Sequence, residues 1–92
     1  MTKAEIVNEI ANKTGLEKVA TMQVVESFME EVEKSLESGE NVYLRGFGSF
    51  IVKKRAAKIA RNISKNTSLE IPEHNIPAFK PAKTFVAKVS KL

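Results

Sequence analysis

The side chains with the clearest chemical capacity in this sequence are cations that no carboxylate accompanies. Between Glu40 and Glu70 the chain has no acidic residue. The cations of that interval are Arg45, Lys53, Lys54, Arg55, Lys58, Arg61 and Lys65. Residues 1–40 carry four lysines against nine glutamates, a net charge of −5, whereas residues 41–92 carry eleven cations against two glutamates, a net charge of +9. A positive field concentrated in this way attracts polyanions, of which nucleic acid is the commonest.

Catalytic and metal-binding chemistry lacks the residues it would need. The chain has a single histidine, His74, and no cysteine, so it offers neither a nucleophile with its base nor a set of metal ligands. The segment Gly46-Phe47-Gly48 lacks the third glycine and the following helix of a nucleotide-binding loop. We therefore expect no enzyme, no metal, no cofactor and no small-molecule substrate, and we expect His74 to be a surface or turn residue.

The N-terminal residues lack the apolar run of a signal peptide, and no apolar segment approaches the roughly 20 residues that a membrane-spanning helix needs. We expect a soluble protein of the cytoplasm that makes no membrane contact.

Two helices are predicted to position the acidic half. Thr2 and Glu5 have the spacing of a capping box, and an apolar face then recurs until Gly15, which predicts a helix over about residues 3–14. A second helix is predicted from Lys18 to Ser38, with Gly39 as its stop. Its apolar residues form a stripe roughly 120° wide. They include Met22, Val25, Phe28, Met29, Val32 and Leu36. So broad a stripe exceeds what one short helix covers, which favours a second subunit over burial within one small domain.

After Gly39 the apolar period changes to two, which predicts strands. Val42 and Leu44 precede the turn at residues 46–48, and Phe50 and Val52 follow it. Beyond Val52 both faces carry cations, so neither face can be buried. Residues 53–73 are therefore predicted to form a two-stranded ribbon that projects into solvent, has its polar tip at residues 64–66 and returns through Leu69 and Ile71. An isolated ribbon is marginal in water, so we expect this arm to be mobile until it meets a partner.

The last part of the chain is predicted to be an extended segment, residues 77–81, and then a short helix over residues 82–92. Pro81 suits the first position of that helix. Phe85, Val86 and Val89 give the helix an apolar face, and three lysines keep it basic.

Short motifs along the whole chain match those of a known family in order and spacing. They are Thr14-Gly15-Leu16, Gly46-Phe47-Gly48-Ser49-Phe50, Arg55-Ala56-Ala57, Arg61-Asn62, Ile71-Pro72, and Pro77-Ala78-Phe79-Lys80 followed by Lys83. Each motif alone is weak evidence, but the set is highly specific. By this set the chain resembles the HU/IHF family of bacterial, histone-like, DNA-bending proteins.

The resemblance implies an α+β fold with a helical hairpin body, a three-stranded antiparallel sheet, an extended β-ribbon arm and a short C-terminal helix. It also implies an intertwined homodimer. In this organisation residues 1–92 form one domain, with a helical dimerisation region at 1–40, the sheet at 41–81 with the arm at 53–73, and the last helix at 82–92.

The resemblance also implies roles for individual residues. In the family the arms lie in the minor groove of double-stranded DNA, and a residue at the tip wedges between base pairs. The implied DNA-binding residues are Lys53, Arg55, Lys58, Arg61, Asn62, Ile63, Lys65, Lys80 and Lys83, with Ile63 as the wedge. The implied dimer and core residues are Val25, Phe28, Met29, Val32, Leu36, Leu44, Phe47, Phe50 and Phe79. The expected protein is an HU-type component of the nucleoid that bends and compacts DNA with low sequence preference. Its DNA partner could also be distorted or nicked.

Four positions depart from the family's pattern. Ile63 stands where proline is usual; it can replace stacking surface as a wedge but lacks proline's fixed φ. Lys65-Asn66 stands in place of threonine-glycine, and asparagine tolerates positive φ better than most residues. Ala82 replaces a glycine, and its methyl group puts a backbone contact with phosphate in doubt.

Two other functions stay open at this point. One is a sequence-preferring subunit of the IHF type, whose selectivity would come from DNA deformability because the minor groove distinguishes little beyond A·T from G·C. The other is a dimeric structural or interaction module that binds no DNA, in which lysines on exposed strands only prevent edge-to-edge aggregation. Lys53 or Lys54 fits the latter reading, but seven cations without an acid do not.

Overall fold

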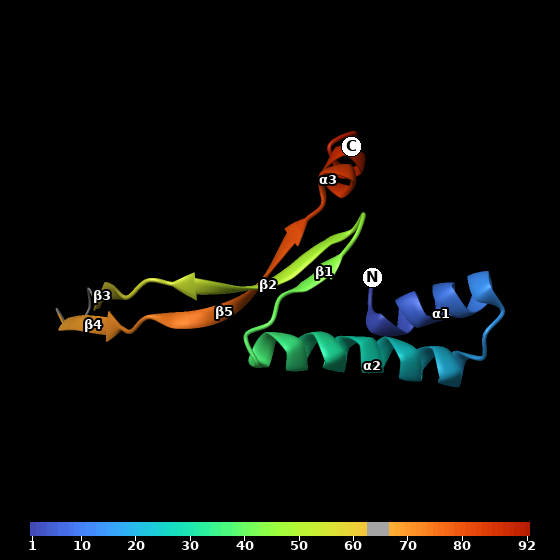
Figure 1. The fold of residues 1–92 in the computed structure, drawn as a ribbon, viewed down its shortest axis with the longest axis horizontal. Helices are drawn as coiled ribbons and strands as arrows, with labels where there is room; N and C mark the ends of the chain where they lie inside the picture. The colour runs from blue at the N-terminus through green and yellow to red at the C-terminus, as the bar shows by residue number, and fades with distance from the viewer. Residues whose placement is uncertain (63–66) are drawn as a thin grey trace. The chain divides into compact units, whose positions relative to one another are not determined.

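In the computed structural model the backbone is described for residues 1–62 and 67–92, and side chains are described for residues 1–57 and 72–92. The elements in chain order are α1 (Lys3–Thr14), α2 (Lys18–Glu37), β1 (Val42–Leu44), β2 (Gly48–Arg55), β3 (Lys58–Asn62), β4 (Thr67–Ile71), β5 (His74–Pro81) and α3 (Lys83–Val89) (Figure 1). The chain divides into two compact units, Met1–Ser35 and Leu36–Leu92. In the described part of the chain, no helix is both long enough and apolar enough to cross a membrane.

The first helix begins and ends at the signals that predicted it. The hydroxyl of Thr2 accepts a hydrogen bond from the Glu5 amide at 3.2 Å and donates one to the Glu5 carboxylate at 3.3 Å. At the other end Gly15 has φ 77°, and its amide donates to the Ala11 carbonyl at 2.9 Å. The left-handed conformation is one that glycine adopts without steric cost, so the chain can leave the helix here.

Helices α1 and α2 lie side by side and are joined by both polar and apolar contacts. Lys3 Nζ lies 3.3 Å from a carboxylate oxygen of Glu26. Val7 and Ala11 are the buried apolar residues of the described chain, and Thr21 is buried with its hydroxyl donating to the Glu17 carbonyl at 2.8 Å. Two buried apolar side chains are a very small core for a domain of this size.

The apolar stripe of α2 is largely uncovered in the single chain. Phe28 and Met29 are 46% and 39% exposed. Val25, Val32 and Leu36, which continue the stripe, are only half-buried. The stripe is therefore present as predicted, but the chain itself does not cover it.

Strands β1, β2 and β5 form one antiparallel sheet in the order β1-β2-β5. The turn from β1 to β2 is closed by the Phe47 amide, which donates to the Leu44 carbonyl at 3.0 Å. Strand β5 pairs with all of β2, from Gly48 opposite Pro81 to Arg55 opposite His74. The predicted α+β fold with a three-stranded sheet is confirmed.

Strands β3 and β4 pair as the outer part of the arm and continue beyond the ends of β2 and β5 (Figure 1). Their antiparallel register runs from Lys58 opposite Ile71 to Asn62 opposite Thr67. Between the inner and outer pairs the strand assignment stops at residues 56–57 on one side and 72–73 on the other. The sequence predicted a two-stranded ribbon over residues 53–73, and within this ribbon the ladder is interrupted where Pro72 has no amide to donate. The predicted tip at residues 64–66 falls on residues outside the described part, and the predicted mobility of the arm stays a prediction.

The prediction that Pro81 is the first residue of the last helix is wrong. Pro81 is the last residue of β5, Ala82 is the extended cap residue with φ −69° and ψ 154°, and α3 begins at Lys83. The Ala82 amide donates to the Phe47 carbonyl at 2.9 Å, which ties this residue to the sheet turn. The helix ends at Val89 and not at residue 92.

Candidate nucleic-acid interface

A cluster of four phenylalanines lies beneath the end of the sheet where α3 begins. The ring centroids of Phe47 and Phe79 are 5.1 Å apart, those of Phe50 and Phe79 5.0 Å, and those of Phe47 and Phe85 5.4 Å. Three of these residues were expected as an aromatic core; Phe85 was predicted only as part of the helix's apolar face. Phe47 is 46% exposed and Phe79 38% exposed, so the cluster still offers apolar surface.

The opposite face of the sheet carries polar and basic side chains, with the half-buried apolar residues Ile51, Ala78 and Ile76 among them. Side chains alternate between the two faces of a strand, and the register places Tyr43, Ser49 and Lys80 in one cross-strand row. The next row, Val42, Phe50 and Phe79, belongs to the aromatic face. Near the sheet turn a shallow concave surface of about 610 Å³ includes Arg45, Lys80 and Lys83 in its lining. This surface has the charge that a phosphate backbone would need.

The side chain of Asn41 forms hydrogen bonds at the end of β1 that extend the pairing of β1 with β2. Its side-chain oxygen accepts from the Val52 amide at 2.9 Å, and its side-chain nitrogen donates to the Tyr43 hydroxyl at 3.1 Å. The side chain thus supplies an acceptor to a β2 amide that lies beyond the last β1 pair, Val42 opposite Phe50. Asn41 carried no signal in the sequence, because its two partners are defined only by the strand register.

The base of the arm carries three consecutive cations on β2. Lys53, Lys54 and Arg55 are all exposed, and they face Ile76, Asn75 and His74 on β5. Lys54 forms an ion pair with Glu73 at 2.6 Å. His74 is exposed, which agrees with the expectation of a surface residue; it is the first residue of β5, and its Nδ1 lies 3.0 Å from the Pro72 carbonyl oxygen.

The structure places the predicted DNA-binding residues in three groups. Lys53, Arg55, Lys80 and Lys83 are exposed and belong to the same unit. Lys58, Arg61 and Asn62 lie in β3 by their backbone, but their side chains are outside the described part. Ile63 and Lys65, and with them the predicted wedge, lie outside the described residues altogether.

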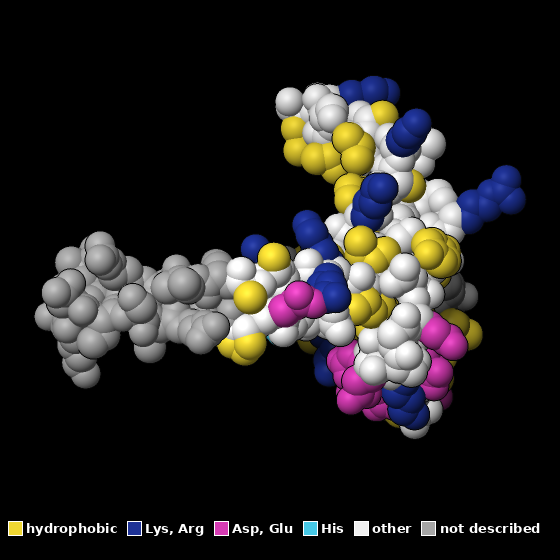
Figure 2. Space-filling view, turned by 60° about the vertical axis from the view of Figure 1, so that its left-hand side comes forward, with side chains coloured by type: hydrophobic (Ala, Val, Ile, Leu, Met, Phe, Trp, Pro, Cys, Tyr) yellow, Lys and Arg dark blue, Asp and Glu magenta, His cyan; other side chains and the backbone are white. Residues whose placement is uncertain are grey.

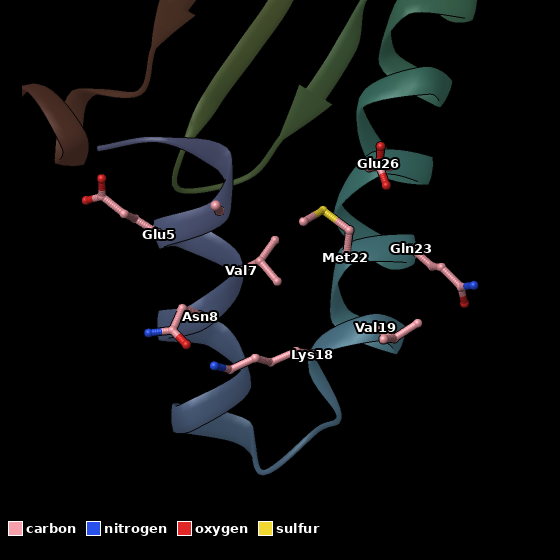
Figure 3. A pocket seen from close by; sticks show the side chains of 9 residues that line it. Glu5, Val7, Asn8, Lys18, Val19, Met22, Gln23 and Glu26 are labelled. Carbon is pink, nitrogen blue, oxygen red and sulfur yellow. The ribbon is translucent and has the colours of Figure 1, made fainter.

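The two units differ in surface charge as the sequence indicated. In Figure 2 Lys and Arg side chains are spread over the sheet and α3, and most Glu side chains gather over α1 and α2; the chain has no Asp. The helical unit has a groove of about 680 Å³ between α1 and α2, into which Val7 and Met22 point from opposite sides (Figure 3). Its lining also includes Glu5, Glu26 and Lys18. A mainly apolar groove with a single cation and two carboxylates is unsuited to a polyanion.

Comparisons with known proteins agree with this arrangement over its full length. Residues 1–90 match the family model described as bacterial DNA-binding protein. The DNA-binding protein HU of Thermus thermophilus is 38% identical over 91 residues, which is 99% of this chain and 94% of that protein. The DNA-binding protein HU of Clostridium pasteurianum is 40% identical over 91 residues, 99% of this chain and 100% of that protein.

Solved structures show the same fold. An Anabaena HU–DNA cocrystal structure superposes with a TM-score of 0.93 at 36% sequence identity and covers 100% of both chains. HU from Thermotoga maritima superposes with a TM-score of 0.67 at 27% identity and covers 97% of this chain and 98% of that one.

Proposed function

The chain belongs to the bacterial DNA-binding protein family, and on that premise we propose that it is an HU-type architectural protein that binds, bends and compacts double-stranded DNA. The observation that carries the proposal is the β-ribbon with the exposed cations Lys53 and Arg55 at its base, on a fold that matches a DNA-bound HU structure over its whole length. The protein would then act in the nucleoid.

Binding in this proposal is driven by electrostatics. Each cation that neutralises a phosphate releases condensed counterions, so the logarithm of the binding constant falls with the logarithm of salt by about 0.9 per phosphate. On the body of the protein, Lys80 and Lys83 lie beside the sheet turn and supply charge for flanking DNA. On the arm, Lys53 and Arg55 lead to Lys58, Arg61, Asn62 and Lys65 further out. Because the minor groove carries a degenerate pattern, low sequence preference follows.

Bending is assigned to Ile63 at the end of the arm. An apolar side chain that enters between base pairs costs a few kcal/mol of stacking, and the bent duplex then offsets this cost by lying against more protein surface. Because isoleucine lacks proline's fixed φ, the bend angle or the preference for distorted DNA is expected to differ from that of a proline-tipped arm.

A homodimer provides the second arm that wrapping DNA requires. The α2 stripe leaves Phe28 46% exposed, and the aromatic cluster leaves Phe47 equally exposed. A second copy that covers these surfaces would bury the apolar area that one chain cannot bury alone, at about 25 cal/mol for each Å². Val25, Met29, Val32, Leu36 and Leu44 belong to the same proposed interface and core.

A salt titration of DNA binding tests the proposal. Fluorescence anisotropy with a short duplex of arbitrary sequence should give tight binding at low salt and, for about 6–10 phosphate contacts, a log–log slope of about −5 to −9. Unlabelled duplexes of unrelated sequence should compete almost equally, whereas an IHF-type protein would prefer one of them. Nicked and four-way-junction duplexes would show whether distorted DNA is favoured. Weak association at every salt concentration would mean that the cations serve only to keep the strands from aggregating.

A further inference from the structure

An ion pair divides the cations at the base of the arm into two groups. Lys54 Nζ lies 2.6 Å from a carboxylate oxygen of Glu73. In the β2–β5 ladder Lys54 is opposite Asn75, so Glu73, two residues before Asn75, is its diagonal neighbour on the same face of the ribbon. Diagonal neighbours on an antiparallel pair are within reach of long side chains. The contact therefore follows from the strand register and joins the two strands across the arm.

The other face of the arm base has cations without such a partner. Lys53 and Arg55 point to the face opposite that of Lys54, because side chains alternate along a strand. Across the ladder they face Ile76 and His74. Among the residues whose side chains are described, no ion pair joins either cation to a carboxylate. One face of the arm base thus carries two unpaired positive charges, and the other carries a neutral pair.

We propose that Glu73 withholds Lys54 from the DNA backbone, so that the base of the arm binds phosphates with its Lys53 and Arg55 face. A phosphate that approached Lys54 would have to displace the Glu73 carboxylate and would then lie beside an unpaired negative charge. Among the side chains that the structure describes, no carboxylate competes in this way for a phosphate that approaches Arg55. The inference rests on the proposed function and adds to it which side of the arm meets DNA.

Substitution of Glu73 by glutamine tests this directly, because the amide keeps the shape of the side chain and removes its charge. In E73Q the freed Lys54 should gain a phosphate contact, which steepens the log–log salt slope by about 0.9. At fixed moderate salt the affinity for a short duplex should rise about two- to fivefold, the range of an exposed ion pair. An unchanged salt slope in E73Q would overturn the proposal.

The charge-balanced double variant K54Q/E73Q is the matched control. If Lys54 makes no phosphate contact in the wild-type protein, this variant should keep the wild-type slope. A slope flattened by about 0.9 would show that Lys54 is an ordinary phosphate contact, and the proposal would be wrong. Both outcomes presuppose that the wild-type protein binds the duplex with a steep slope. If it does not, it is the proposed function that fails, and the two failures are told apart in the same titration.

Discussion

At the scale of single residues, Gly48 is the sheet glycine with the least room for a side chain. A Cβ atom at this position would lie 2.6 Å from the Lys80 carbonyl oxygen and 2.6 Å from Cζ of Phe79. Contacts this short require the backbone or the aromatic cluster to shift. Gly48 therefore lets β5 and the Phe79 ring approach the start of β2 closely.

Replacement of Gly48 by alanine should lower the free energy of unfolding by about 1–3 kcal/mol, the usual cost of forcing extra volume into a packed site. Chemical denaturation at matched protein concentration measures the change. Ser49→Ala, one residue along β2, is the control and should change the value by less than about 0.5 kcal/mol. Equal stability of Gly48→Ala and the wild type would mean that Phe79 moves aside freely.

Arg55 is the cation of the arm base for which a DNA contact can be tested most directly, because it is exposed and its backbone position in the ladder is fixed opposite His74. Arg55→Ala should weaken binding to all duplexes and flatten the log–log salt slope by about 0.9. Lys34→Ala, which removes a cation from the acidic helical part, should leave the slope unchanged. A change in sequence preference at constant slope would contradict the assignment of Arg55 to phosphate.

Ile63, which lies outside the described residues, is the residue that we propose as the wedge that turns binding into bending. Ile63→Ala should reduce the DNA bend angle at saturation, because a methyl group replaces little stacking surface. Fluorescence energy transfer between dyes at the two ends of a duplex measures the angle. Ile63→Pro is the companion variant and should bend DNA at least as strongly as the wild type, since it fixes φ at the tip. An unchanged angle in Ile63→Ala would remove Ile63 as the wedge.

At the scale of elements, predictions held where the signal was local. Thr2 caps α1 through Glu5, three residues away, and Gly15 ends the helix by its own conformation, so both ends could be located from neighbouring residues. Lys53, Arg55, Lys80 and Lys83 were identified as candidate contacts from charge and family motifs; all four are exposed, and their contact with DNA stays a prediction.

Predictions failed or were missing where the local structure depends on pairing between residues that are distant in the sequence. Pro81 could have opened a helix by its φ alone, but it pairs opposite Gly48 and is followed by the bond from Ala82 to Phe47. The contacts of Lys54 with Glu73 and of Phe47 with Phe85 likewise depend on which residues the register and the last helix bring together. A period of two in the sequence locates strands but does not state their register.

At the scale of the whole molecule, the exposed stripe of α2 should determine the oligomeric state. Phe28→Asp places a charge on the stripe and should shift the protein from dimer towards monomer, with loss of tight DNA binding because two arms no longer act together. Sedimentation velocity measures the oligomeric state. Val19→Asp is the matched control: Val19 is 64% exposed, lies off the stripe and belongs to the groove between α1 and α2, so this variant should remain dimeric. A dimeric Phe28→Asp protein would contradict the proposed interface.

The small core formed by Val7 and Ala11 has a consequence for the life of the protein in a growing cell. A chain that folds only with a second copy has a folded fraction that depends on how much of it is made, since association stabilises by mass action. Newly synthesised chains at low abundance would be substrates for proteases until they find one another. The rate of synthesis would then have a threshold. Below it almost no folded protein would be bound to the chromosome, and above it the amount of bound protein would rise steeply with expression.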